Sequence, residues 1–158
     1  MAAKRSKSKA EVKAVSTAGR KHVQTFLSEP LRLELSTHDY TAFPAPVRIT
    51  FTLDRPYHFR LSYHAYGDIL GGASQQLITK AVIAINKELH RETEMAHEYN
   101  PSSTYRGHWF TSGETFVELT AGTYTVELLH KTTASNWASF VEYTAENVRL
   151  SCDWIESE

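Results

Sequence analysis

Two histidines and a glutamate in the segment 87–99 have a spacing that could bind a metal ion. His90, Glu94 and His97 stand at positions i, i+4 and i+7, which share one face of an α-helix. Two imidazoles and a carboxylate are zinc ligands. The segment is polar and contains good helix formers, but an extended, charged edge strand fits it equally well. Since the tighter His-Glu-x-x-His arrangement is absent, we favour a solvated polar face and expect no metal and no cofactor.

A second group of histidines and tyrosines lies within residues 57–66. Cupin-type jelly rolls take metal ligands from two histidines separated by one residue, because i and i+2 point the same way on a strand. Here His58 and His64 are six positions apart, and no glutamate ligand pattern accompanies them. The group, which also contains Tyr57, Tyr63 and Tyr66, therefore indicates an exposed strand face.

The nucleophile and phosphate-binding motifs of common enzymes are absent. Ser74 follows Gly72 and Ala73 but lacks the second glycine of a Gly-x-Ser-x-Gly elbow. No glycine-rich stretch is followed by the Lys-Ser/Thr pair of a phosphate loop. Cys152 alternates with Leu150 and Trp154, which predicts a small core residue and not a reactive thiol. We therefore expect the chain not to be an enzyme.

The run 105–109 combines aromatic rings with a guanidinium and an imidazole. Aromatic faces beside an arginine suit stacking on sugars or bases. Arg106, His108 and Trp109 are thus candidate ligand-binding residues of a lectin-like module. For Tyr105 and Trp109 we favour packing in a core or a subunit interface over ligand stacking.

Short β-strands must position these groups, because apolar and polar residues alternate along most of the chain. Residues 31–36, 47–53, 57–64, 123–129 and 147–155 show this period of two. The run 80–86 has a continuous apolar centre at residues 81–85, which is typical of a strand buried on both faces. Proline and glycine separate eight to ten such segments. We expect an all-β, two-sheet antiparallel sandwich of jelly-roll type over residues 26–158.

The N-terminal segment differs in composition from the rest of the chain. Residues 1–21 contain seven basic residues and one acidic residue, whereas the remainder contains ten basic and seventeen acidic residues. Such a polar leader buries too little apolar surface to offset its ordering entropy. We expect a flexible, disordered basic arm over residues 1–25 that contacts nucleic acid phosphates or an acidic protein surface, with a solvated tail as the alternative. The candidate contact residues are Lys4, Arg5, Lys7, Lys9, Lys13, Arg20 and Lys21.

The overall composition is that of an ordinary folded domain. Among 158 residues, 11% are aromatic and 22% are charged, and Cys152 is the single cysteine, which excludes a disulfide framework. Residues 1–18 lack the apolar stretch of a signal peptide, and no stretch approaches the roughly 20 apolar residues of a membrane span. We expect a cytoplasmic or virion protein that is not exported by a signal peptide and does not bind membranes.

The segment 110–132 resembles the closing strands of jelly-roll domains of the C1q/tumour-necrosis-factor type. Those domains often contain a Leu-x-Ala-Gly-x-Tyr/His-x-Val-x-Leu hairpin, which residues 119–128 match, and the stretch 59–65 fits one of their inner strands. The resemblance covers about a third of the chain. A basic arm ahead of a jelly roll also resembles viral coat, decoration and fibre-head proteins. Residues 1–25 contain no collagen-like or coiled-coil pattern, and in this the chain departs from the C1q/tumour-necrosis-factor resemblance.

The resemblance implies a homotrimer that is used for assembly or recognition. The residues it suggests for the subunit interface are Tyr57, Tyr63, Tyr105 and Trp109. Our leading expectation is a non-enzymatic structural protein that builds or decorates a particle such as a virion, tethered through its arm. The alternative is a carbohydrate- or ligand-binding module of lectin type. Fold analogy by itself establishes neither function.

Overall fold

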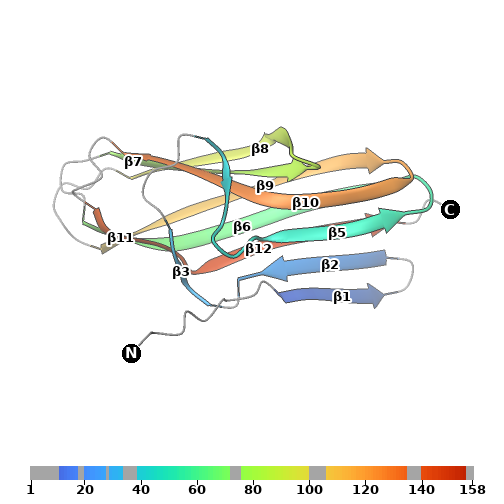
Figure 1. The fold of residues 1–158 in the computed structure, drawn as a ribbon, viewed down its shortest axis with the longest axis horizontal. Coiled ribbons are helices and arrows are strands. Elements are labelled where there is room, and N and C mark those ends of the chain that lie inside the picture. The colour runs from blue at the N-terminus through green and yellow to red at the C-terminus, as the bar shows by residue number, and fades with distance from the viewer. Residues whose placement is uncertain are drawn as a thin grey trace, which may run out of the picture.

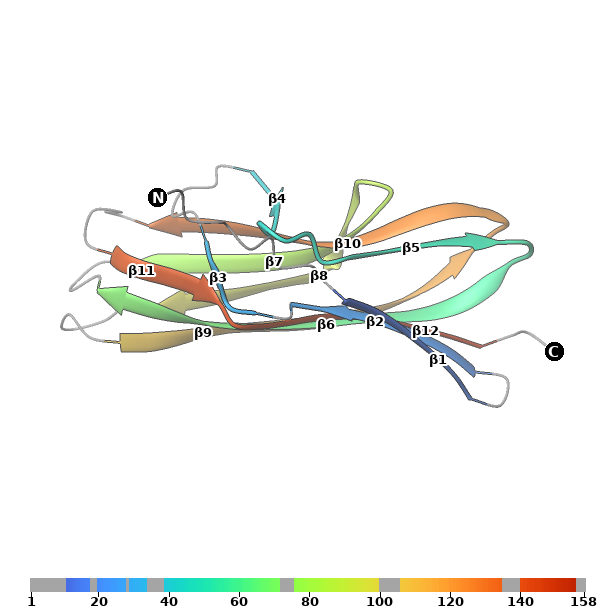
Figure 2. The ribbon, with the colours of Figure 1, turned by 60° about the horizontal axis from the view of Figure 1, so that its bottom comes forward.

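The fold is a sandwich of two antiparallel β-sheets. A computed structural model describes residues 11–17, 20–27, 29–33, 39–71, 76–99, 106–134 and 140–155. All regular elements within these ranges are β-strands, and the strands pair antiparallel in two sheets (Figure 1). Figure 2 shows the sheets as two stacked layers. The predicted all-β, two-sheet antiparallel sandwich is confirmed.

Sheet I is built around a long central strand, β6 (Tyr57–Gly71). One edge of β6 pairs with β9 (Arg106–Leu119), and the other edge pairs first with β12 (Asn147–Ile155) and then with β11 (Phe140–Ala145). The remaining strands extend the sheet on the β12 and β11 side: β2 (Arg20–Phe26), β1 (Glu11–Thr17) and β3 (Leu31–Arg32).

Sheet II contains the other five strands. Its order is β8 (Glu88–Tyr99), β7 (Leu77–Ile85) and β10 (Gly122–Ala134), and the far edge of β10 pairs with both β5 (Arg48–Leu53) and β4 (Thr41–Ala42). In β7 the residues from Ala81 to Ile85 are all buried. This burial matches the continuous apolar run, because such a strand is covered on both faces.

The core lies between the two sheets and is filled from both. Its largest fully buried side chains include Trp109, Tyr143, Phe43 and Phe59. The Tyr143 hydroxyl from sheet I lies 2.9 Å from the hydroxyls of Thr79 and Thr132 in sheet II. Cys152 is buried as predicted, and burial raises the pKa of its thiol to about 12.

The segment 87–99, for which the sequence left helix and strand open, is strand β8. Its pairing with β7 shifts register, because Ala81 pairs with Met95 whereas Ile83 pairs with His90. Four residues of β8 therefore bulge out opposite Val82. Helix propensity is a weak preference, and here the ladder with β7 overrides it.

The N-terminal segment differs in part from the flexible arm that the sequence predicted. Residues 1–10 lie outside the described part of the chain, but β1 and β2 form an antiparallel hairpin, and β2 pairs with β12. The backbone donors and acceptors of a sheet edge favour such pairing whatever the hydrophobicity of the added strand. In the described ranges no helix is long and apolar enough to cross a membrane.

Candidate ligand-binding face

Three of the four residues suggested for a subunit interface are core residues instead. Tyr57, Tyr63 and Trp109 are at most 5% exposed. The Tyr63 hydroxyl donates to the backbone carbonyls of Ala81 and Thr93 at 3.1 Å, and burial raises its pKa to about 12. All three side chains fall on the inward phase of their strands, so none of them can meet another subunit. Tyr105 lies outside the described residues.

Trp109 is likewise excluded as a ligand-stacking residue. Its indole nitrogen donates to the Thr144 carbonyl at 2.7 Å, and its ring packs against Tyr143 with centroids 5.8 Å apart. The other two candidates of the same run, Arg106 and His108, are exposed on the opposite face of β9. Adjacent residues of a strand point to opposite faces, which separates the tryptophan from its neighbours.

His108 belongs to a polar cluster at one end of the outer face of sheet I. Its Nδ1 lies 2.6 Å from an Asp68 carboxylate oxygen and 2.9 Å from the Tyr66 hydroxyl, and the His108 and Tyr66 rings stack at 5.4 Å. Burial and the neighbouring Asp68 carboxylate raise the pKa of Glu146. This end of the face therefore presents hydrogen-bonding groups next to the stacked rings of Tyr66 and His108.

The most exposed large hydrophobic side chain in the described part of the chain lies on the same outer face. Phe116 of β9 is 72% exposed, and Phe110, six residues earlier on the same phase, is 45% exposed. The Phe110 ring meets the His64 imidazole edge to face at 5.1 Å. An exposed aromatic ring offers a flat apolar surface on which a ligand can pack.

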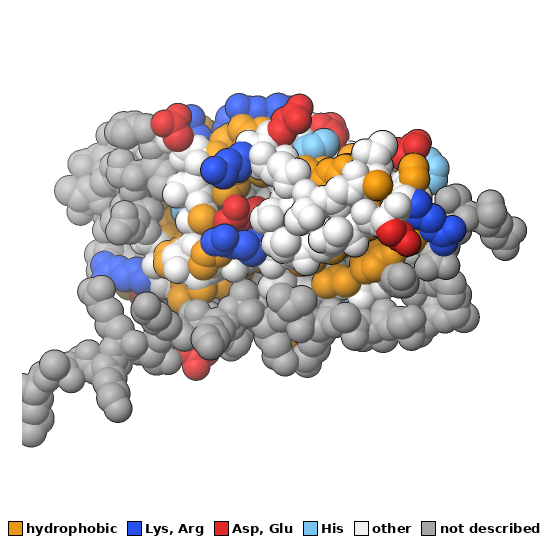
Figure 3. Space-filling model, turned by 45° about the vertical axis from the view of Figure 1, so that its right-hand side comes forward, with side chains coloured by type: hydrophobic (Ala, Val, Ile, Leu, Met, Phe, Trp, Pro, Cys, Tyr) orange, Lys and Arg blue, Asp and Glu red, His pale blue; other side chains and the backbone are white. Residues whose placement is uncertain are grey.

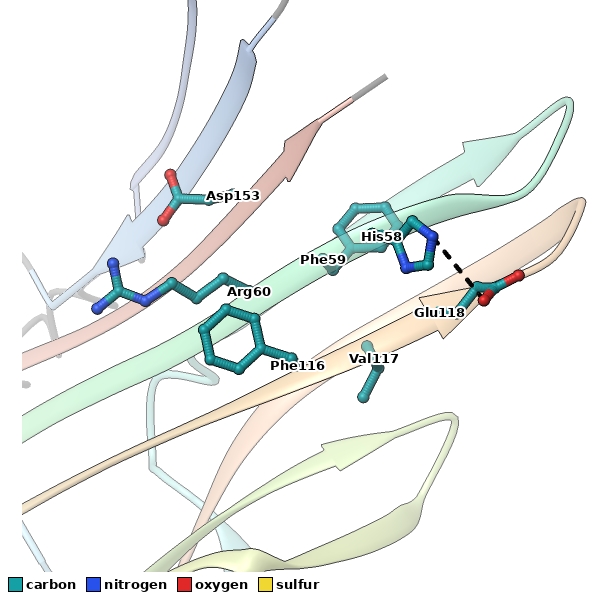
Figure 4. Close-up of a pocket in the computed structure, with 7 residues that line it drawn as sticks. All are labelled: His58, Phe59, Arg60, Phe116, Val117, Glu118 and Asp153. Atoms are coloured by element: carbon teal, nitrogen blue, oxygen red, sulfur yellow. Dashed lines mark ion pairs between the residues drawn. The ribbon is translucent and has the colours of Figure 1, made fainter. Parts of the chain in front are cut away.

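A shallow groove of about 240 Å³ runs beside Phe116 (Figure 4). It crosses the strands from β9 over β6 to β12, and Figure 4 shows the Phe116 ring beside the Arg60 side chain. The groove is lined by His58, Phe59, Arg60, Phe116, Val117, Glu118 and Asp153. It is a surface depression and not a deep pocket, so it suits a ligand that lies along the sheet.

Acid–base pairs surround the groove. The Arg60 guanidinium donates twice to one Glu114 oxygen, at 3.0 and 2.7 Å, and this bond raises the pKa of Arg60. Next to it, His58 lies 3.9 Å from Glu118. On the far side, the Asp153 carboxylate lies 2.5 Å from a His22 ring nitrogen. With one arginine and three carboxylates, this part of the face has a net charge of −2 when its histidines are neutral.

The structure does not support a metal site in either histidine group, the one in residues 87–99 or the one in residues 57–66. In β8 the three residues no longer share a helix face, and Glu94 is bound by Tyr40, Arg91 and Lys80. Histidines six residues apart on a strand are separated by roughly 20 Å, which prevents His58 and His64 from sharing an ion. In the described ranges no group of three or more histidine, cysteine, aspartate or glutamate residues could hold a metal.

Three residues of this face were not predicted from the sequence: Phe116, Arg60 and Glu114. The sequence does contain a signal for Phe116, in the alternation of apolar and polar residues along β9. Val117 and Leu119 set the apolar phase of that strand, so Phe116 is an aromatic residue on the polar phase. The pairing of β9 with β6, which places Arg60 opposite Phe116, has no signal in the sequence.

Of the seven residues proposed for the arm, four lie outside the described part of the chain: Lys4, Arg5, Lys7 and Lys9. The other three belong to β1 and β2: Lys13, Arg20 and Lys21. Their role in binding a partner stays a prediction.

Comparison with known proteins adds nothing to the assignment of this face. No protein-family model and no curated protein matches the chain. Among solved structures, a family 35 carbohydrate binding module from an environmental isolate is similar, with 15% identity, 89% of this chain and 91% of that chain covered, and a TM-score of 0.30. A TM-score this low carries no inference, so the choice of a ligand class rests on the geometry of the face alone.

Proposed function

We propose that this chain is a non-enzymatic binding module that holds carbohydrate on the outer face of sheet I. The observation that carries the proposal is the exposed Phe116 ring in a shallow groove, with Arg60 beside it and acid–base pairs on both sides. This is the lectin-like module that the sequence offered as an alternative, with Phe116 instead of Trp109 as the stacking residue.

The chemistry of a sugar ring matches this arrangement. A pyranose has apolar C–H faces, which pack on an aromatic ring, and a rim of hydroxyls that donate and accept hydrogen bonds. Glu114, Glu118 and Asp153 supply acceptors around Phe116, and Arg60 supplies donors. The negative net charge of the face favours a neutral sugar over an acidic one. A groove this shallow fits a chain of sugar units that lies across the strands.

The test compares polysaccharide binding by the full chain and by Phe116→Ala. Affinity electrophoresis against a panel of neutral and acidic polysaccharides gives the retardation of each protein. Met95→Ala is the matched control, because Met95 is an exposed apolar residue (47%) on β8 of the other sheet. We expect retardation by a neutral polysaccharide that Phe116→Ala reduces roughly tenfold, which corresponds to one well-placed stacking contact.

Two outcomes would refute the proposal. One is the absence of retardation by any polysaccharide in the panel. The other is equal binding by the full chain and Phe116→Ala, since the ring would then contribute nothing.

A role in assembly is the second candidate function, and one observation favours it. β1 is the terminal strand of sheet I, and in the described part of the chain no strand pairs with its outer edge. Open strand edges pair readily with another chain. In this version the protein is a homotrimer that builds or decorates a particle such as a virion, and its basic N-terminal residues contact a neighbouring subunit or nucleic acid.

Light scattering at low and high salt tests the assembly role. The native mass of the full chain is compared with that of a variant without residues 1–10, which lie before β1. A salt-resistant trimer in both proteins supports assembly through the sandwich itself. Loss of the trimer in the variant supports assembly through residues 1–10. A monomer in every condition rules out the homotrimer.

A further inference from the structure

Sheet II has a groove on its outer face that is larger than the one beside Phe116. Its volume is about 580 Å³, which falls within the range of small-molecule sites. One wall is the segment 39–42, and the other is the β7–β8 turn with the start of β8. Ala84, Leu89 and Leu129 supply apolar lining between the two walls.

Tyr40 ties the two walls together at one end of this groove. Its hydroxyl donates to Glu94 of β8, and the Arg91 guanidinium lies over its ring, 5.2 Å from the centroid. Arg91 also donates to Glu94 at 2.7 Å. Burial and the bond to Glu94 raise the pKa of Tyr40. The groove is therefore formed by contacts between distant parts of the chain.

The groove carries an excess of positive charge, and Figure 3 shows Lys and Arg side chains in blue, interspersed with carboxylates in red, on the side of the molecule that it draws. Lys87, Arg91 and Lys131 line it together with Asp39 and Glu127. When the adjoining ion-pair partners Arg48, Lys80 and Glu94 are added, five cations face three carboxylates, which gives a net charge of +2. The sign is opposite to that around Phe116.

Lys131 is a cation of this groove that has no carboxylate partner among the described residues. It stands directly opposite Lys80 in the β10–β7 ladder, and like charges in that position are destabilising. Lys80 reaches Glu94 at 3.8 Å, whereas no carboxylate in the described part of the chain pairs with Lys131. The same is true of Lys87, which the β7–β8 turn holds at a positive φ of 73°.

We propose that this groove is a second binding site, which takes a small organic anion with an apolar body. The anionic group would lie beside Lys131, and the apolar body would cover Leu129 and Leu89 in the direction of Lys87. This site shares no residue with the face around Phe116, so it does not depend on the proposed carbohydrate binding.

A pair of matched fluorescent probes tests the site on the full chain. Anilinonaphthalene sulfonate has an aromatic body and a sulfonate, whereas N-phenylnaphthylamine has the same rings without the charge. We expect the sulfonate to bind more tightly than the neutral probe, with an affinity that falls as salt is added. The double variant Lys87→Gln, Lys131→Gln should weaken sulfonate binding by roughly tenfold.

Two controls separate the groove from other sources of probe binding. Arg60→Gln with Arg149→Gln removes two cations from the outer face of sheet I, and Phe116→Ala removes the most exposed ring; both should leave sulfonate binding unchanged. Circular dichroism checks that each variant is folded. Equal affinity for the two probes, or unchanged sulfonate binding by the double lysine variant, would overturn the proposal.

Discussion

Phe116 of β9 stands directly opposite Arg60 of β6 in the antiparallel ladder, and both side chains point away from the core into solvent. One position along the same ladder, Val117 of β9 stands opposite Phe59 of β6, which is 1% exposed. Two phenylalanines on neighbouring strands thus lie on opposite faces of one sheet. Substitution of the exposed Phe116 therefore tests ligand binding, whereas substitution of the buried Phe59 tests stability.

Phe116→Ala should leave the free energy of unfolding within about 0.5 kcal/mol of the original, because the ring is exposed. Phe59→Ala should lower it by about 3–5 kcal/mol, because that ring is buried against other aromatic rings and its removal leaves a cavity. Urea unfolding followed by circular dichroism measures both. A large loss of stability in Phe116→Ala would show that the ring packs against the fold.

Trp109→Phe should cost about 1–3 kcal/mol of unfolding free energy. The smaller ring keeps most of the apolar packing, but the Thr144 carbonyl loses its donor and stays buried. The measurement is again urea unfolding. A cost below the lower bound would mean that water replaces the indole at that carbonyl.

Gly67→Ala should destabilise the protein by about 4 kcal/mol or more. A methyl group at residue 67 would overlap the Thr144 backbone oxygen and the Trp109 indole, and neither can move without breaking the hydrogen bond between them. Thermal unfolding or the yield of soluble protein reports the loss. Near-original stability of Gly67→Ala would contradict the close contact between β6 and β11.

Protonation of His130 should contribute to unfolding in acid. The imidazole is 3% exposed and lies against Phe43, with ring centroids 4.6 Å apart. Burial lowers its pKa from 6.5 to about 4. The folded state therefore favours the neutral ring, so this contribution to stability is complete above pH 6.5 and is lost as the pH falls toward 4.

The expected size of this loss is about 2 kcal/mol between pH 7.5 and pH 5. It is measured as the difference in unfolding free energy between the original chain and His130→Gln at each pH, because the other titrating groups are common to both. If that difference does not change with pH, His130 has the same pKa in the folded and the unfolded chain.

The strands were predictable because alternation is a local property of the sequence. The period of two in residues 47–53 and 57–64 reflects one buried and one solvated face, and both segments are strands with that burial pattern. The buried position of Cys152 follows from the same phase. For residues 87–99 local propensity was ambiguous, and only the partner strand β7 resolved it.

The sequence by itself determined the all-β class, the sandwich and the buried phase of most strands, because each depends on which side chains leave water. Only the tertiary structure decided which residues share a surface. Phe116 meets Arg60, and Lys131 meets Lys80, through pairings between residues more than 50 positions apart. For Trp109 the sequence favoured core or interface packing but left a ligand site open, and the structure confirms the core position. The polar neighbours of Trp109 are exposed, but a strand places adjacent residues on opposite faces. The buried indole donates its N–H to the Thr144 carbonyl.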